Sequence, residues 1–244
     1  MTAMTADERA CALSRSWMEQ GTAGFLAALD RIDDDGLGDS TALTGWTRRH
    51  VIAHVAANAE ALGRLVRWAR TGEECRMYSS QEQRNGDIEN GSRLPATDLR
   101  QWVRSSAQKL SDDLSELSAA QWGHCVVTAQ GRTVTARELP WMRSREVMVH
   151  AVDLGSGTAF ADLPAGFLGA LVADVAVKRS AAANGPSLTV EATDTGESWD
   201  ISGTGERLTV GGPLASIASW LTGRAVAAIK TTDGTAVPEL PAWL

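Results

Sequence analysis

The stretch GWTRRHVIAHVAANAEAL, residues 45–62, combines a helical apolar period with two of the chain's four histidines. Residues of one helix face recur at intervals of three and four, and here that face holds Val51, His54, Val55, Asn58 and Leu62. His54 therefore occupies a position that normally faces a protein core. The pattern predicts a helix of about 25 residues that begins near Thr47 and ends at Gly72, with His50 one turn before His54.

The same period recurs on both sides of this stretch. It predicts a first helix over residues 7–31, a short helix over 81–90 and a third long helix over 98–117. Residues 124–135 are expected to be extended. A fourth long helix follows, with Thr135 and Glu138 at the spacing of a capping box, and Pro140 predicts a kink or a late start. Four long helices within 157 residues are typical of a four-helix bundle.

The later part of the chain has a different pattern. After a helix over 165–182, short alternating runs separated by DTG and GTG predict a small antiparallel meander within residues 187–212. A helix over 213–229 follows, with Pro213 suited to its first turn. The sequence therefore predicts an α+β chain with a bundle domain over 1–157 and a smaller α+β domain with a short antiparallel sheet over 158–244.

Composition excludes several classes of protein. The chain is 43% hydrophobic, and no window holds the roughly 18 uncharged apolar residues of a membrane span. A net charge of −7 without a large basic cluster argues against nucleic acid as a partner. Three cysteines in no CxxC pair and no signal-peptide pattern at the N-terminus favour the cytoplasm. No long apolar heptad calls for a second copy, so a monomer is expected.

A second histidine lies on the inward stripe of the fourth long helix. Glu146 and His150 are four residues apart on this stripe, which continues to Asp153. A bundle that buries such groups must satisfy them, and a metal ion does so. Together with His54 they would form a His₂Glu set, the ligand type of catalytic zinc with an open position.

Ordinary structural roles explain the same residues. Glu146 and His150 suit a weak surface pair, and His54 suits a core histidine held by a backbone carbonyl. His50 is a rival ligand because it forms an HxxxH pair with His54. His124 adjoins Cys125, but no further ligand is near them in the sequence.

Two segments carry a resemblance to a known family. GW followed by HVIAHVAANAEAL, and REVMVHAVDLG on the fourth long helix, resemble the DinB-like metal-dependent bundle superfamily, specifically its mycothiol-dependent maleylpyruvate isomerase branch. That branch adds a C-terminal α+β domain with an LTGR-like segment, and SWLTGRA occupies residues 219–225 here. The resemblance extends over essentially the whole chain and implies a DinB-like four-helix bundle.

The resemblance also implies site residues and an activity. Zinc would be held by His54, Glu146 and His150, Arg84 would serve catalysis and bind the substrate, and Arg224 would bind the substrate from the C-terminal domain, which would close the active-site cleft. The implied cofactors are Zn²⁺ and mycothiol, whose zinc-bound thiol becomes a thiolate nucleophile. The implied reaction is isomerisation of maleylpyruvate to fumarylpyruvate in gentisate catabolism by thiolate addition, bond rotation and elimination.

Three other functions stay open at this stage. A zinc-dependent mycothiol S-transferase would use the same ligands but leave the thiol attached to an electrophile. A non-catalytic binding protein would keep the fold without the chemistry. A purely structural bundle would use the Glu-His network only for stability.

Overall fold

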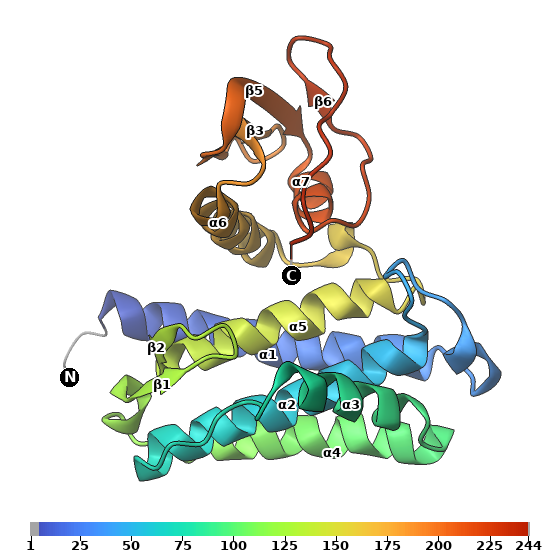
Figure 1. Cartoon of the computed structure of the whole chain (residues 1–244), viewed down its shortest axis with the longest axis vertical. Helices are drawn as coiled ribbons and strands as arrows, with labels where there is room; N and C mark the ends of the chain where they lie inside the picture. The colour runs from blue at the N-terminus through green and yellow to red at the C-terminus, as the bar shows by residue number, and fades with distance from the viewer. Residues whose placement is uncertain (1–4, 244) are drawn as a thin grey trace. The chain divides into compact units, whose positions relative to one another are not determined.

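The computed structural model describes residues 5–243, and the chain divides into two compact units, Met1–Thr158 and Ala159–Leu244 (Figure 1). Residues 1–4 and 244, the outer ends of the two expected domains, lie outside the described part. None of the described helices is long and apolar enough to cross a membrane.

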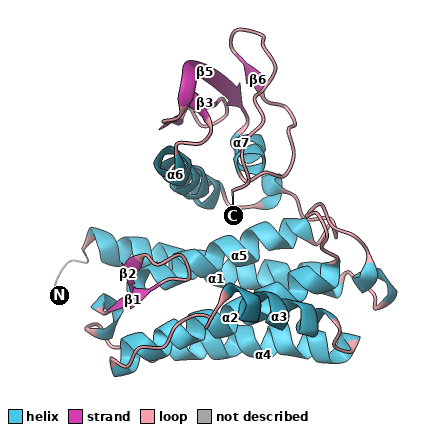
Figure 2. Cartoon of the chain, viewed as in Figure 1, coloured by secondary structure: helices cyan, strands magenta, loops and turns pink. Residues whose placement is uncertain are grey.

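The first unit contains the expected helical bundle (Figures 1 and 2). In it α1 packs against α5, and α2 packs against both α4 and α5, while the short α3 lies against α2. The helices are α1 (Ala6–Asp30), α2 (Arg48–Thr71), α3 (Gln81–Ser92), α4 (Ala96–Ser115) and α5 (Leu139–Asp153). Buried aliphatic and aromatic side chains from all of them fill the interior. The prediction of an α+β protein with an N-terminal bundle is confirmed.

Helix α2 begins and ends at the residues its sequence indicates. Thr47 is the N-cap, and its backbone N–H donates to Nδ1 of His50 at 3.2 Å. The His50 ring thus satisfies a backbone donor that the helix start leaves open. Gly72 ends the helix with φ 79°, a left-handed conformation that glycine adopts without strain. His50 therefore has a structural task at the start of α2.

The start of α5 differs from the expected capping box. Thr135 makes no side-chain cap bond, and Ala136–Glu138 form a 3₁₀ turn before α5 begins at Leu139. The carboxylate of Glu138 instead accepts from Arg132 at 3.2 Å. Pro140 lies in the first turn of α5, where its missing N–H leaves no helix bond unmade. The late start, one of the two expected effects of Pro140, is what the structure shows.

Before α5 the chain forms a small hairpin. Strands β1 (Cys125–Val127) and β2 (Thr133–Thr135) pair antiparallel, which confirms the expected extended segment. Val126 and Val134 face each other across the pair and are both buried. The hairpin therefore contributes to the bundle core.

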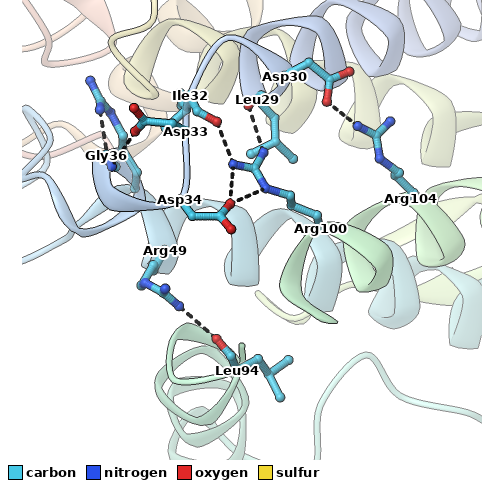
Figure 3. Close-up of polar contacts among 11 residues, drawn as sticks. Leu29, Asp30, Ile32, Asp33, Asp34, Gly36, Arg49, Leu94, Arg100 and Arg104 are labelled. Carbon is cyan, nitrogen blue, oxygen red and sulfur yellow. Dashed lines mark hydrogen bonds and ion pairs between the residues drawn. The ribbon is translucent and has the colours of Figure 1, made fainter. Parts of the chain in front are cut away.

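Arginine side chains bind the carbonyl groups at the C-terminal ends of helices (Figure 3). Arg100 donates to the carbonyl of Leu29 at 3.1 Å and to that of Ile32 at 2.6 Å, and it also pairs with Asp34. In the same way Arg48 donates to the carbonyl of Leu154 at 2.7 Å, just after α5. A guanidinium suits the negative end of a helix dipole. At Leu29 it adds to the N–H of Ile32, which donates to the same carbonyl at 3.1 Å.

Within residues 159–243 the second unit holds a four-stranded sheet and two α-helices. Its elements are α6 (Ala165–Ala182), β3 (Pro186–Ala192), β4 (Ser198–Ile201), β5 (Thr204–Gly212), α7 (Leu214–Leu221) and β6 (Lys230–Thr231). The strand order is β4-β3-β5-β6. The prediction of an antiparallel meander is wrong, because β3 and β5 pair in parallel, with Val190 opposite Val210.

The mixed sheet results from a short crossing at Ser202 and Gly203. These two residues carry the chain from β4 past the end of β3, and Thr204 then donates its N–H to the carbonyl of Gly185 at 2.8 Å. A Cβ atom at position 203 would lie 2.3 Å from that carbonyl oxygen. Glycine at this position therefore allows β5 to lie beside β3 instead of β4.

The last predicted helix is shorter than expected. It was expected to reach residue 229, but α7 ends at Leu221. Gly223 follows with φ 75°, and the hydroxyl of Thr222 donates to the carbonyl of Ala218 at 2.7 Å. The left-handed glycine ends the helix, and the following residues run on without regular structure to β6.

Gly21 lets α1 approach α5 closely. A Cβ atom there would lie 2.6 Å from Cγ2 of Val147 and 2.8 Å from Cγ of Met148, whereas Gly24 has nothing within 4 Å. We expect Gly21→Ala to lower the free energy of unfolding by about 1–3 kcal/mol. The matched variant Gly24→Ala should raise it by about 0.5–1 kcal/mol through helix propensity. Urea denaturation measures both, and equal effects of the two variants would contradict this account of the α1–α5 contact.

Candidate metal centre

The structure brings together His54 of α2 with Glu146 and His150 of α5. One ligand atom from each lies within 4.8 Å of the others, and in residues 5–243 no other group of three His, Cys, Asp or Glu side chains does so. Oε2 of Glu146 lies 2.9 Å from Nε2 of His54 and 3.4 Å from Nε2 of His150. The two imidazole rings are nearly perpendicular, at 86°, with centroids 4.9 Å apart. Both Nε2 atoms thus face one carboxylate.

This donor set fits a zinc ion. Two imidazole nitrogens and a carboxylate oxygen at about 2.1 Å from a tetrahedral metal are roughly 3.4 Å from one another. The measured separations of 2.9 and 3.4 Å are close to that value. Three protein ligands leave a position open, which is the arrangement of catalytic sites.

Burial and hydrogen bonding shift the pKa values of all three side chains. Burial would raise the pKa of Glu146, but hydrogen bonds from His150 and His54 hold it well below the ordinary value. Burial lowers the pKa of His54, and its bond to Glu146 opposes this only in part. For His150 burial also acts to lower the pKa, yet the carboxylates of Asp153 and Glu146 outweigh it and raise the value. The cluster therefore keeps an ionised carboxylate inside the bundle.

Asp153 lies behind His150, on the side away from Glu146. Its Oδ2 is 2.8 Å from Nδ1 of His150, and its side chain is 1% exposed. A carboxylate in this position fixes the ring and places the proton on Nδ1, which leaves Nε2 as a metal donor. The spacing of three residues on one helix face was the available signal, but it did not distinguish this role from ordinary packing.

Arg84 reaches the centre from α3. Its Nη2 lies 3.5 Å from Nδ1 of His54, and its guanidinium is 6.0 Å from the ring centroid of Tyr78. Burial raises the pKa of Tyr78, opposed by the charge of Arg84. The segment that carries Tyr78 is held by Arg64, which donates to the carbonyl of Met77 at 2.8 Å. Tyr78 is a neighbour of the site that the sequence did not reveal, because it lies outside any periodic stripe.

The other candidate residues lie elsewhere. Nε2 of His50 is 3.3 Å from the carboxylate of Glu89, in addition to its contact with Thr47. His124 has Nδ1 at 2.6 Å from the carbonyl of Ala69, and Cys125 is exposed. Neither histidine belongs to the cluster of three, so the rival ligand pairs are not assembled.

Arg224 belongs to the second unit. It donates to the carbonyl of Thr222 at 2.5 Å, and its guanidinium lies 5.8 Å from the ring centroid of Trp243. The aromatic ring and the carbonyl hold the guanidinium in one orientation. Its role in substrate binding stays a prediction.

Comparison with known proteins agrees with this arrangement. Residues 18–155, which include all three clustered side chains, match the family model of the mycothiol maleylpyruvate isomerase N-terminal domain. The chain belongs to this family. It is 39% identical to a solved mycothiol-dependent maleylpyruvate isomerase, over 96% of this chain and 97% of that one, with a TM-score of 0.92. A variant of such an enzyme with one histidine replaced by alanine matches at 38% identity, with the same coverage and TM-score. No curated protein matches the chain.

The Asp153–His150 pair predicts a pH dependence in the metal-free protein. Because the folded state raises the pKa of His150, the pair stabilises the fold fully below the unfolded value of about 6.5 and loses this effect as pH rises through the folded value. We therefore expect Asp153→Asn to destabilise the chelator-treated protein more at about pH 5.5 than at about pH 8.5. Urea denaturation at both pH values measures the difference.

The control for this prediction is Asp113→Asn. Asp113 is also largely buried, with a side chain 16% exposed, but its partner is Lys109. Since no histidine is involved, the effect of this substitution should be equal at the two pH values. A pH-independent loss in Asp153→Asn as well would contradict the coupling of Asp153 to His150.

Proposed function

We propose that this protein catalyses the zinc- and mycothiol-dependent isomerisation of maleylpyruvate to fumarylpyruvate. The observation that carries the proposal is the 39% identity to a solved mycothiol-dependent maleylpyruvate isomerase over 96% of the chain. The buried His54, Glu146 and His150 cluster supports a metal at the centre of the bundle. The matching family model, over residues 18–155, also spans the two helices that carry these side chains.

The residues of the centre suit this chemistry. Zn²⁺ bound by them would supply the positive charge that lowers the pKa of a thiol and makes it a nucleophile at neutral pH. Asp153 holds His150 in the tautomer that offers Nε2, and the ionised Glu146 supplies the one anionic donor. The chain's own thiols, Cys11, Cys75 and Cys125, are not members of the cluster. The nucleophile is therefore an external thiol, for which the family's mycothiol is the candidate.

The substrate's structure determines the steps. Maleylpyruvate has a cis double bond conjugated with a carbonyl, so adding a thiolate forms a C–S bond and moves the π electrons to the carbonyl oxygen as an enolate. The former double bond is then single and rotates. Return of the enolate electrons breaks the C–S bond and leaves the trans double bond, fumarylpyruvate. The thiol is regenerated, and nothing is oxidised or reduced.

Arginine side chains are the candidates for binding the negatively charged groups of the substrate. Maleylpyruvate carries two carboxylates and its adduct an enolate, and guanidinium groups bind such oxygens in pairs of hydrogen bonds. Arg84 is beside His54 and is the candidate for the enolate or the nearer carboxylate. Arg224 is the candidate for a further contact from the second unit, which we propose closes the cleft. The net charge of −7 makes local cations necessary for an anionic substrate.

The cysteines and the net charge of the chain bear on its compartment and its partners. We propose a cytoplasmic monomer that binds these small molecules and no nucleic acid. The three free cysteines suit a reducing compartment, and the acidic charge is unsuited to nucleic acid. Light scattering of the purified protein tests the monomer.

The central test measures metal content together with turnover. We expect about one zinc per chain in the wild type and its loss in His54→Ala and His150→Ala, because each substitution removes one of three ligands. The absorbance change of maleylpyruvate should require both zinc and catalytic amounts of mycothiol. The matched control His50→Ala should retain zinc, since His50 serves the start of α2.

Each of the other outcomes would contradict a different part of the proposal. Stoichiometric consumption of thiol would indicate an S-transferase. Full zinc content in both ligand variants would remove the metal assignment. A wild type without metal, in which His54→Ala only lowers thermal stability, would indicate a structural network.

The two arginines should affect catalysis without affecting zinc. We expect Arg84→Ala to lower kcat about 10²- to 10³-fold, the size seen when one donor to a developing oxyanion is removed. Arg224→Ala should mainly raise the KM for substrate or mycothiol. The control is Arg207→Ala, because Arg207 is exposed and paired with Asp200 in the same unit as Arg224. Wild-type kinetics in either test variant would remove that arginine from the mechanism.

A further inference from the structure

A buried arginine links the two helices that carry the clustered side chains. Arg143 of α5 is 1% exposed. Its Nη1 donates to the carbonyl of Val55 at 2.7 Å and to Oδ1 of Asn58 at 2.9 Å, both on α2. The side chain therefore crosses from one helix to the other inside the bundle.

The position of this link matches that of the clustered side chains on both helices. On α5, Arg143 precedes Glu146 by three residues and His150 by seven, so the three share one face. On α2, its acceptors are the residue after His54 and the residue one turn further along. Arg143 thus binds α2 beside the point where His54 meets Glu146.

Packing alone does not account for an arginine here. Burying a guanidinium is unfavourable, and burial lowers the pKa of Arg143 to about 10 despite the charge of Glu146. Among residues 5–243 its Nη2 has no hydrogen-bond partner, and neither acceptor of Nη1 is a carboxylate. An apolar side chain of similar length would fill the space without these penalties. What an apolar residue cannot supply is the pair of directed bonds to α2.

We propose that Arg143 is a positioning residue of the metal centre, which fixes the separation between His54 on α2 and the Glu146–His150 pair on α5. The inference rests on the proposed metal site and adds a residue to it. A site whose ligands come from two helices binds metal tightly only if those helices are already spaced for it, because otherwise binding must also order them. The two bonds of Arg143 supply that spacing next to the ligands.

Hydrogen bonding and charge predict opposite effects on metal affinity. As a cation near the centre, Arg143 repels a metal ion, so losing its charge alone would raise the affinity. As a link between α2 and α5, its loss would lower the affinity. Arg143→Met removes charge and bonds, whereas Arg143→Lys keeps the charge but lacks the planar fork that reaches two acceptors.

The experiment measures metal binding by the full-length protein. Zn²⁺ affinity is obtained by competition with a chromogenic chelator, and the visible spectrum of the Co²⁺-loaded protein reports ligand geometry. We expect Arg143→Met to lower Zn²⁺ affinity roughly 10- to 100-fold, as for other residues that orient metal ligands, and to alter the Co²⁺ spectrum. Arg143→Lys should also weaken binding, but less than Arg143→Met.

The controls separate positioning from general stability. Arg100→Met removes another arginine that binds backbone carbonyls in the same unit, those of Leu29 and Ile32. It should lower the melting temperature and leave Zn²⁺ affinity and the Co²⁺ spectrum unchanged. If Arg143→Met does not fold, Arg143→Met with Asn58→Leu replaces both polar side chains by apolar ones, and the same loss of affinity is expected.

Two results would overturn the proposal while leaving the proposed function intact. One is wild-type Zn²⁺ affinity and Co²⁺ spectrum in a folded Arg143→Met or double variant. The other is tighter binding in Arg143→Met with unchanged binding in Arg143→Lys, which would assign the effect to charge. A wild type that binds no Zn²⁺ refutes the metal site itself, and that result is distinguishable because it needs no variant.

Discussion

The structure depends on one constraint, the position of the largely buried Glu146 carboxylate between two imidazoles of a helical bundle. An ionised carboxylate leaves water only when donors or a cation replace its hydration. Here α2 and α5 supply His54 and His150 on either side of it, at 2.9 and 3.4 Å. The relative position of these two helices is thus limited by chemistry as well as by packing. Gly21 allows α1 to pack closely against α5. Arg48 of α2 donates to the carbonyl of Leu154 just after α5, which also fixes these two helices relative to each other.

Arginine side chains have two roles in this acidic chain: they bind backbone carbonyls, and they place positive charge near the clustered side chains. Near the ends of helices, Arg48, Arg49 and Arg100 donate to backbone carbonyls. Near the centre, Arg84 and Arg143 place positive charge beside Glu146 and His54. The protein as a whole has a net charge of −7 and repels anions at a distance. Arg143 is buried and Arg84 is half-buried, so salt screens their charges less than it screens charges on the surface.

The helical period of the sequence made the bundle predictable. Helical spacing placed His54 on the inward face of its helix and Glu146 with His150 on another, so the bundle could be predicted from the pattern. The family and the enzyme class were implied by the resemblance of the segments that carry these residues, and the ligand roles stay predictions. The parallel pairing of β3 with β5 could not be predicted, because turn signals such as GTG mark where a chain reverses and not which strand it joins next. The link made by Arg143 was equally hidden. A pattern of apolar residues identifies a face, but it does not show how far a long polar side chain reaches across to another helix.

His54 and His150 have different groups beside Nδ1, and the difference concerns the role of Arg84. His150 has the carboxylate of Asp153 there, an acceptor that fixes Nδ1 as the protonated nitrogen. His54 has Nη2 of Arg84 at 3.5 Å, which is a donor. If Nε2 of His54 binds a metal, its Nδ1 carries a proton and cannot accept from Arg84. Metal binding would therefore leave the guanidinium without this partner, at the edge of the centre and with donors directed at whatever anion binds. The acceptor beside His150 and the donor beside His54 thus support the proposal that Asp153 serves the metal site and that Arg84 serves the substrate.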